Sequence, residues 1–475
     1  MIASAAQIEL GAPAFDAEPA PPGLPSAEGL SAVGRRLRLT VAFVLLLLVT
    51  ATLFLRPADL LPDLEDLPIY EVLTVACLIA ALPEVLAQLT PGALAAGPIT
   101  VCVVGILIAI VASHLSHADV GDAWFNGVEF VKVLLYYLLL VGIIDSPAQL
   151  RRFLTCMAVL IAILATIPLL QHHGFIELDT ISALDDHGVD RNTGQALFFS
   201  RLQGPGIFHD PNDLCHIMGV GVVLCLQGLV GGRFLVLRAL WLAPIAALLW
   251  AMVLTQSRGG IIALAAGLAV FALLRFGWKR ALIVGAFAGP LLLGLLSGRQ
   301  ADLSLDTETS RERIQLWNDA LDLFRAHPVL GVGQGNFERA EGLVAHNSFI
   351  QCFVELGWVG GGCFVAAFYL AMRIVLRKPA ADPTAVPITS LLALRPYLAA
   401  AIAAYVIGMM SLTRSYLVPT YLMLGLATAY SRVGPAAGGA AGPRLCGRLL
   451  LELLLVSVAF LAGAFLWIRA SVHWQ

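Results

Sequence analysis

The sequence is poor in charge, and this shortage already limits the class of protein. Only 13% of its 475 residues are Asp, Glu, Lys or Arg, whereas 59% are hydrophobic and the mean hydropathy is +0.85. A soluble chain normally has about a quarter of its residues charged, because it must cover its core with polar surface. The composition therefore predicts a protein that crosses a lipid bilayer many times.

Motifs for metal, nucleotide and nucleic-acid chemistry are also lacking. The eight cysteines include no C-x-x-C pair, which argues against a disulfide framework or a zinc site and favours small core residues. No P-loop, strand-led G-x-G-x-x-G or D-x-D motif occurs, so nucleotide chemistry on the cytoplasmic side is not expected. The net charge of −3 offers no basic excess for a nucleic-acid partner.

The N-terminal segment, residues 1–34, is rich in Ala, Pro and Gly. It lacks the basic start and the apolar core of a secretory signal, so we expect a disordered cytoplasmic tail. Residues 35–475 are expected to form a single transmembrane domain.

Long apolar stretches fill that domain. A helix needs roughly 20 apolar residues to cross a bilayer core about 30 Å thick. The fold class expected is all-α and polytopic, with about 12–13 transmembrane helices, although the short third and twelfth stretches leave counts of twelve or fourteen open. The expected spans lie near 37–55, 69–89, 98–113, 128–144, 150–170, 213–231, 235–254, 259–276, 280–298, 347–372, 394–413, 416–431 and 448–468.

The positions of Lys and Arg orient these spans. Most of those close to the expected spans fall on the side of the N-terminus, which the positive-inside rule assigns to the cytoplasm. Two long loops, at about 171–212 and 299–346, then share the outer face. We expect the polar chemistry of the protein on that face.

The first loop ends in a polar, turn-rich segment. Arg201, Asp210 and Asn212 surround a Gly-Pro-Gly turn just before an expected span. They are either ligands for a substrate or, for Asp210 and Asn212, caps of the following helix. Arg258 and Arg414 occupy tight outer turns, where an arginine either binds an anion or extends along the lipid interface.

The second loop predicts an amphipathic helix. Thr309 to Glu312 has capping-box spacing, so the helix should start near Ser310. Arg313 and Trp317 then share one face with two apolar residues, and Arg313 lies at the positive end of the helix, a place suited to a lipid phosphate. The glycine-rich segment 331–335 is expected to end this helix and to allow close backbone packing.

A polar row opens the tenth expected span. Asn347, Gln351 and Glu355 recur every four residues, so they should face the protein interior or a wet cavity. His346 precedes them at the water–lipid boundary and can exchange a proton near neutrality. It is either a catalyst or a satisfied structural histidine.

In this order, the motifs resemble those of the O-antigen ligase and O-antigen polymerase superfamily of bacterial membrane glycosyltransferases. The resemblance rests on Arg201 with G-x-F-x-D-P-N, on S-R-G-G at Arg258, on Arg313-x-x-x-Trp317 with its glycine-rich sequel, and on the His346 segment. It is strong over about residues 195–365.

The resemblance implies transfer of a glycan from undecaprenyl pyrophosphate to an acceptor hydroxyl at the periplasmic face of the inner membrane, without cofactor or metal. The implied donor is an undecaprenyl-pyrophosphate-linked glycan, and the implied acceptor is lipid A core or another glycan. It implies an inverting enzyme in which His346 is base or acceptor guide. The implied catalytic set is His346, Arg201, Arg313 and Arg258, and the implied substrate-binding set is Asn347, Asp210, Asn212, Arg311, Trp317, Gln351 and Arg414.

Several functions remain open at this level. A ligase for lipopolysaccharide, a polymerase of surface polysaccharide and a protein O-glycosylating ligase would use the same site. A lipid or solute transporter is the alternative from another class, but its polar residues should line a midplane path between repeats. No repeat is obvious in the sequence, and the candidates gather at one surface.

Overall fold

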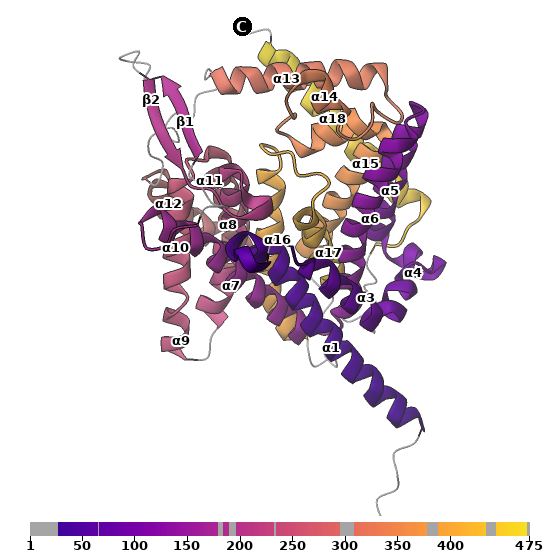
Figure 1. Ribbon diagram of the computed structural model, residues 1–475, viewed down its shortest axis with the longest axis vertical. Coiled ribbons are helices and arrows are strands. Elements are labelled where there is room, and N and C mark those ends of the chain that lie inside the picture. Colours follow the sequence, from indigo (N-terminus) through magenta and orange to yellow (C-terminus); the bar gives the residue numbers. More distant parts are fainter. Residues whose placement is uncertain are drawn as a thin grey trace, which may run out of the picture.

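The computed structural model describes residues 27–64, 66–178, 184–189, 196–231, 234–294, 308–377, 388–433 and 443–472 (Figure 1). These residues are overwhelmingly helical, which confirms the all-α, polytopic class. Eleven described helices are long and apolar enough to cross a membrane. They are α1 (Ala27–Leu55), α3 (Ile69–Gln88), α5 (Pro98–Ser116), α6 (Val120–Ile143), α7 (Pro147–His172), α8 (Pro211–Gly231), the pair α9 (Leu235–Ala239) and α10 (Leu242–Leu254), α11 (Arg258–Phe276), α15 (Ser348–Leu376), α16 (Ile388–Gly408) and α18 (Gly447–Val472).

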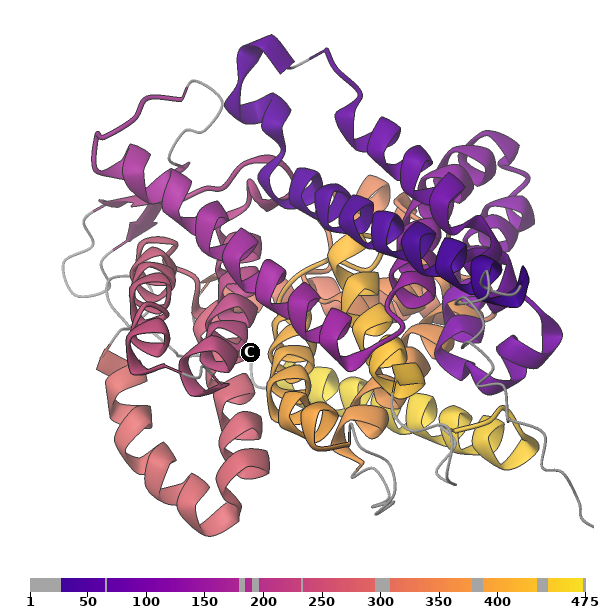
Figure 2. The ribbon, with the colours of Figure 1, turned by 90° about the horizontal axis from the view of Figure 1, so that it is seen from below.

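Two other expected spans are helical but shorter. α12 (Trp278–Gly294) has 17 residues and α17 (Val418–Val433) has 16, so at 1.5 Å per residue they rise only about 26 and 24 Å. The end of the ninth expected span, 295–298, lies outside the described residues. α12 is placed at the periphery beside α11 (Figure 2), whereas α17 is buried from Pro419 to Tyr430 and packs inside the bundle against α6 and α15.

The remaining elements are short or lie at one end of the bundle. They are α2 (Pro57–Leu60), α4 (Pro91–Ala96), α13 (Glu308–Ala326), α14 (Asn336–Glu341), two 3-10 turns at Pro62–Leu64 and Gly206–Phe208, and the strands β1 (Leu184–Val189) and β2 (Ala196–Arg201). β1 and β2 form an antiparallel hairpin in which Leu184 is opposite Arg201. The sequence reasoning did not foresee this hairpin, because β2 lacks the alternation of apolar and polar residues typical of a half-buried strand.

Both long loops reach the same end of the molecule. The hairpin and α13 lie at the upper end in Figure 1, and α13 runs across the top of the bundle. Below them, α15 packs along α5, and α11 packs along α16 and α8. Gly267 of α11 lies where a Cβ would come within 2.9 Å of Ala404 in α16, a close approach of the kind that small residues allow between membrane helices.

Two expected helix starts and one helix end need correction. α1 begins at Ala27, so the last part of the expected disordered tail is helical, since a helix once formed extends at little cost through residues such as Ala and Leu. α13 begins at Glu308 instead of near Ser310. It ends at Ala326, ahead of the glycine-rich segment, because Pro328 cannot continue a helix.

α15 is broken at Gly357. This glycine has φ 63° and ψ −159°, a region that residues with a Cβ essentially do not adopt. The backbone groups that the break frees find partners in the loop after α13. Trp358 N–H donates to the Pro328 carbonyl (2.8 Å), and the Val354 carbonyl accepts from Val332 N–H (3.0 Å). The loop therefore completes the hydrogen bonding of the helix, as buried backbone groups require.

Candidate functional site

His346 occupies an unusual backbone position at the start of α15. Its φ is +49°, in the left-handed region, which histidine adopts more readily than most residues but at some cost in strain. Asn347 follows as the N-cap, and its Oδ1 accepts from the N–H groups of Phe349 (3.1 Å) and Ile350 (3.2 Å). The cap fixes the helix start, and the left-handed turn sets the direction of the half-buried imidazole.

Two side chains hold the peptide just before His346. Trp317 Nε1–H donates to the carbonyl of Ala345 (2.5 Å), and Gln351 Oε1 accepts from Ala345 N–H (2.9 Å). Trp317 also packs against Trp467, with ring centroids 5.5 Å apart. Trp317 and Gln351, expected to bind substrate, thus hold the backbone of Ala345, the residue before His346.

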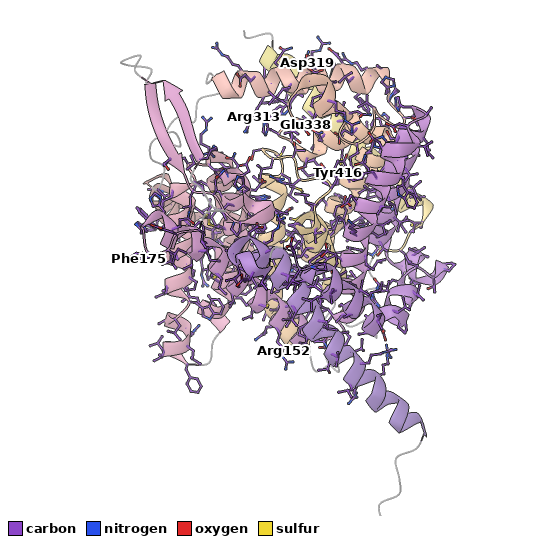
Figure 3. All side chains as sticks on the ribbon, in the orientation of Figure 1. Arg152, Phe175, Arg313, Asp319, Glu338 and Tyr416 are labelled. Carbon is purple, nitrogen blue, oxygen red and sulfur yellow. The ribbon has the colours of Figure 1, made fainter. Side chains whose placement is uncertain are left out.

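Opposite charges flank the imidazole. Burial lowers the pKa of His346 below its ordinary value, the guanidinium of Arg313 lowers it further, and the carboxylate of Asp210 opposes both. Arg313 extends from the side of α13 that faces the bundle (Figure 3). His346, Arg313 and Asp210 come from three separate segments, and the charges of the other two residues act on the imidazole.

A second part of the site is built around Arg201 at the end of β2. Its Nε–H donates to the Thr255 carbonyl (2.9 Å) and its Nη2 donates to Asn212 Oδ1 (3.0 Å). Asn212 N–H in turn donates to Asp210 Oδ1 (2.6 Å). This chain of contacts connects Arg201 with the carboxylate that influences His346.

Arg414 forms an ion pair that sequence reasoning did not foresee. Its guanidinium contacts Asp213, which is only 4% exposed. Burial lowers the pKa of Arg414, and Asp210 opposes the shift. Arg414 N–H also donates to Ser348 Oγ (2.9 Å), next to His346. Because Asp213 balances its charge, Arg414 is better suited to joining segments than to binding an anion.

The polar row of α15 is buried, as expected. Asn347, Gln351 and Glu355 are 4%, 2% and 1% exposed. Glu355 accepts from Gly335 N–H (2.9 Å), Gln351 Nε2 (2.5 Å) and the hydroxyl of Tyr416 (2.8 Å). Tyr416, marked in Figure 3, was missed because nothing local in the sequence distinguishes it.

The remaining two arginines lie at or near the starts of two helices. Arg258 is the first residue of α11, directly after Ser257, whose Oγ accepts from Gly260 N–H (3.4 Å). The same turn contains the Thr255 carbonyl that binds Arg201, so α11 starts beside Arg201. Arg311 is exposed near the start of α13.

Comparison with known proteins relates part of the chain to a protein family. Residues 243–365 match a family model, Wzy_C, described as O-antigen ligase. This match supports the O-antigen ligase superfamily. In general terms it supports a membrane glycosyltransferase of the O-antigen ligase and polymerase type, and the apolar helices support a multi-pass membrane protein. The matched segment contains Arg258, Arg313 and His346, whereas Arg201 and Arg414 lie outside it. No curated protein matches the chain.

Proposed function

We propose that this protein transfers a glycan from undecaprenyl pyrophosphate to an acceptor hydroxyl at the periplasmic face of a bacterial inner membrane. The observation that carries the proposal is the setting of His346, a half-buried imidazole in a left-handed backbone position beside Arg313. An imidazole next to a permanent cation suits a reaction in which one group gives up a proton while a diphosphate leaves.

His346 is assigned as the general base. Because burial and Arg313 keep its pKa below the ordinary value, the ring is neutral at pH 7 and a nitrogen lone pair can accept the proton of the acceptor hydroxyl. General-base catalysis typically contributes about 10²–10⁴ in rate. The same geometry also serves a lesser role, in which His346 only orients the hydroxyl because the diphosphate is already a good leaving group.

The transfer is proposed to be a single displacement. The acceptor oxygen forms a bond to the anomeric carbon while the bond from that carbon to the phosphate oxygen breaks, and the diphosphate leaves with the electron pair. Such a step inverts the anomeric configuration. Asp210, whose carboxylate influences His346, already accepts from Asn212 N–H, so we assign it to loop geometry and to tuning the imidazole.

Arginines are proposed to stabilise the leaving diphosphate without a metal at the reacting centre. A guanidinium presents a planar, permanently charged fork that matches phosphate oxygens. The charge of Arg313 acts directly on the pKa of His346. Arg201 and Arg258 extend from adjoining segments. Arg311 and Asn212 are proposed as further contacts to the donor, and Asn347, Trp317, Gln351 and Arg414 as supports of the site.

The test is an assay of purified protein with undecaprenyl-pyrophosphate glycan and an acceptor. His346→Asn is the sharpest variant, because asparagine tolerates the left-handed backbone but has no base. We expect its rate to fall at least 10²-fold, and Arg313→Gln to fall comparably. His327→Asn and Arg325→Gln are matched controls, since His327 is exposed and Arg325 is an exposed partner of Asp322. Wild-type rates for His346→Asn would remove it from the mechanism.

Parallel reactions with different acceptors identify the natural class of acceptor. Lipid A core, a glycan repeat unit and a peptide hydroxyl distinguish a lipopolysaccharide ligase, a polymerase and a protein-glycosylating ligase that share this site. Initial rates in EDTA at low temperature should stay within about twofold of the untreated rate if no metal takes part in the chemistry. Lipid movement across vesicles without glycan transfer would favour the transporter instead.

A further inference from the structure

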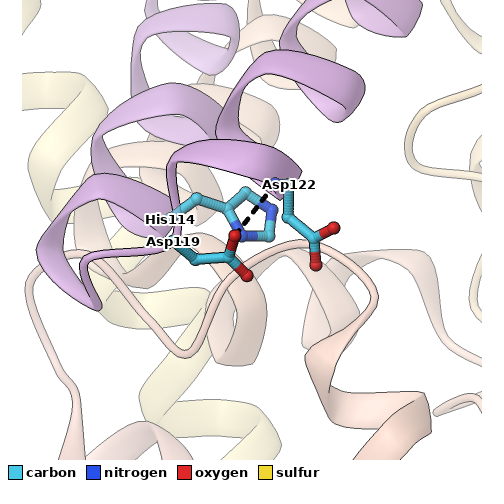
Figure 4. Close-up of side chains that lie close together, drawn as sticks. All are labelled: His114, Asp119 and Asp122. Carbon is cyan, nitrogen blue, oxygen red and sulfur yellow. Dashed lines mark hydrogen bonds between the residues drawn. The ribbon is translucent and has the colours of Figure 1, made fainter.

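Three side chains with metal-ligand chemistry meet at the turn between α5 and α6, and none of them belongs to the site described above. They are His114 in the last turn of α5, Asp119 at the N-cap of α6 and Asp122 in its first turn (Figure 4). One ligand atom from each lies within 4.8 Å of the other two. Ala118, with φ +57°, makes the tight turn that folds Asp119 back toward His114.

His114 is the member that makes this more than an acidic cluster. Its side chain is completely buried (0% exposed), and its Nδ1 has no hydrogen-bond partner among the described residues. A buried polar atom without a partner is costly, and such atoms in native structures call for an explanation such as an ion. Both carboxylates are only half-buried, so solvent can reach them.

The other imidazole nitrogen is occupied. His114 Nε2 lies 3.1 Å from the side-chain amide of Asn126. Because the two ends of an amide are assigned from their hydrogen bonds, a turned amide would let Nε2–H donate to Asn126 Oδ1. Nδ1 then carries a lone pair that can accept a ligand, and Asn126 has the place of the partner that metal-binding histidines commonly have on their second nitrogen.

The loop after α13 closes over the cluster. Gly333, with φ +100°, lies so near that a Cβ there would come within 3.0 Å of His114 Nδ1. Arg339 of α14 contacts Asp122 through Oδ2, and Asp119 Oδ1 accepts from Asp122 N–H (2.9 Å). Asp119 and Asp122 each have a second carboxylate oxygen for a ligand.

We propose that His114, Asp119 and Asp122 bind one divalent transition-metal ion of the zinc class. One imidazole nitrogen and two carboxylate oxygens suit Zn²⁺, whereas Mg²⁺ and Ca²⁺ prefer oxygen ligands alone. Around a tetrahedral zinc ion with ligand bonds of about 2.0–2.2 Å, two ligand atoms lie roughly 3.3–3.6 Å apart. The ligand atoms lie within 4.8 Å of one another, so the side chains have to close by up to about 1 Å when the ion binds. Water completes the coordination.

The ion has a structural role. It holds the α5–α6 turn against Gly333. Gly333 N–H donates to the Glu355 carbonyl (2.9 Å), and the same carbonyl accepts from Ser113 Oγ (2.9 Å). Binding thus stabilises the contact between α5, the glycine-rich loop and α15, and it takes no part in the glycan chemistry.

The test uses the full chain in detergent, stripped with EDTA, supplied with ZnCl₂ and passed through a desalting column. We expect about one zinc per chain by elemental analysis, and a higher thermal unfolding midpoint with ZnCl₂ than with EDTA. His114→Gln and Asp119→Asn should each weaken zinc binding at least tenfold, a loss typical of disturbed metal sites. Asp119→Asn keeps the helix cap, because asparagine caps as well as aspartate.

His117→Gln is the matched control. This neighbouring exposed histidine bonds to the Ser113 carbonyl (2.9 Å) and lies outside the ligand set, so its variant should bind zinc as the wild type does. Arg339→Gln removes a competing cation and should bind at least as tightly. The proposal is overturned if the wild type retains no more zinc than His114→Gln, or if Mg²⁺ at equal concentration displaces the zinc. Neither readout depends on glycan transfer.

Discussion

The two halves of α15 solve the problem of crossing a membrane in different ways. From Ser348 to Gly357 the helix has a buried polar row, and its side chains and backbone bond to other segments. From Trp358 to Leu376 it is mostly apolar, and its Cys363 lies against Gly105 of α5. The upper half depends on individual hydrogen bonds, whereas the lower half depends on general packing. Only the upper half adjoins His346.

This difference teaches where the site gets its geometry. Three other segments converge on the upper half. They are the end of α5, where Ser113 Oγ donates to the Glu355 carbonyl, the loop after α13, and residues 409–416, whose Met409 carbonyl accepts from Ser348 N–H (2.9 Å). A substitution there should disturb several segments at once. An equivalent change in the lower half should be absorbed locally.

The largest expected contrast comes from paired glycine substitutions. Gly357→Ala places a Cβ 2.3 Å from the Val329 carbonyl carbon at a backbone conformation that alanine avoids, so we expect a loss of roughly 4 kcal/mol or more, or failure to fold. Gly362→Ala meets only Ser457 Oγ, 4.0 Å away, and should change stability by at most about 1 kcal/mol. Thermal unfolding in detergent measures both variants. Similar unfolding midpoints would contradict the difference between the two halves of α15.

Removal of polar partners should give the next largest contrast. Glu355→Leu leaves Gly335 N–H, Gln351 and the Tyr416 hydroxyl without their acceptor, which should cost about 2–4 kcal/mol. Tyr369→Phe in the lower half removes one partly exposed bond to Glu452 and should cost less than about 1 kcal/mol. Chemical denaturation compares the two. A Glu355→Leu protein as stable as Tyr369→Phe would show that the polar row is not needed for stability.

Trp317→Phe should have a smaller effect. It keeps the aromatic packing but removes the bond from Nε1 to the Ala345 carbonyl, a loss of about 1 kcal/mol. We expect kcat to fall several-fold because His346 is held less firmly, while Trp358→Phe, a tryptophan beyond the break, leaves kcat unchanged. If both variants have the same kcat, Trp317 does not control the position of His346.

The finest test is the pH dependence of transfer. If neutral His346 is the active form, the rate falls on the acid side as the ring is protonated. Arg313→Gln removes a positive charge, so the pKa of His346 should rise and the acid limb should move to higher pH. Asp210→Asn removes a negative charge, so that pKa and the acid limb should move to lower pH. If the acid limb of the pH–rate profile moves in neither variant, His346 is not the group that titrates.

Local patterns predicted much of this fold. Apolar stretches located the long helices, capping-box spacing found α13 within a few residues, and the four-residue period of Gln351 and Glu355 predicted their burial. These features depend on neighbours in the sequence. The family motifs likewise pointed to His346 and Arg313; the charge of Arg313 acts on the imidazole, and the roles of both residues stay predictions.

Features that depend on distant partners were not predictable. Asp213 and Arg414 are 201 residues apart, and nothing near either residue reveals the ion pair that balances the charge of Arg414. α17 has the composition of a span but is short and enclosed by other helices. The close packing of Gly331 was expected, yet its partner, the backbone of Glu355 in the opened helix, lies in another segment.

The opened turn at Gly357 has a consequence for solvent exchange. In sequence, residues 328–333 resemble an ordinary connecting loop, but Val332 N–H and Gly333 N–H bond to the opened helix, and Trp358 N–H and Val359 N–H bond back to the loop. These amide hydrogens should therefore exchange with deuterium as slowly as those of a helix interior. A protease that cuts surface connections should likewise leave this segment intact, because it is stabilised as part of the membrane domain.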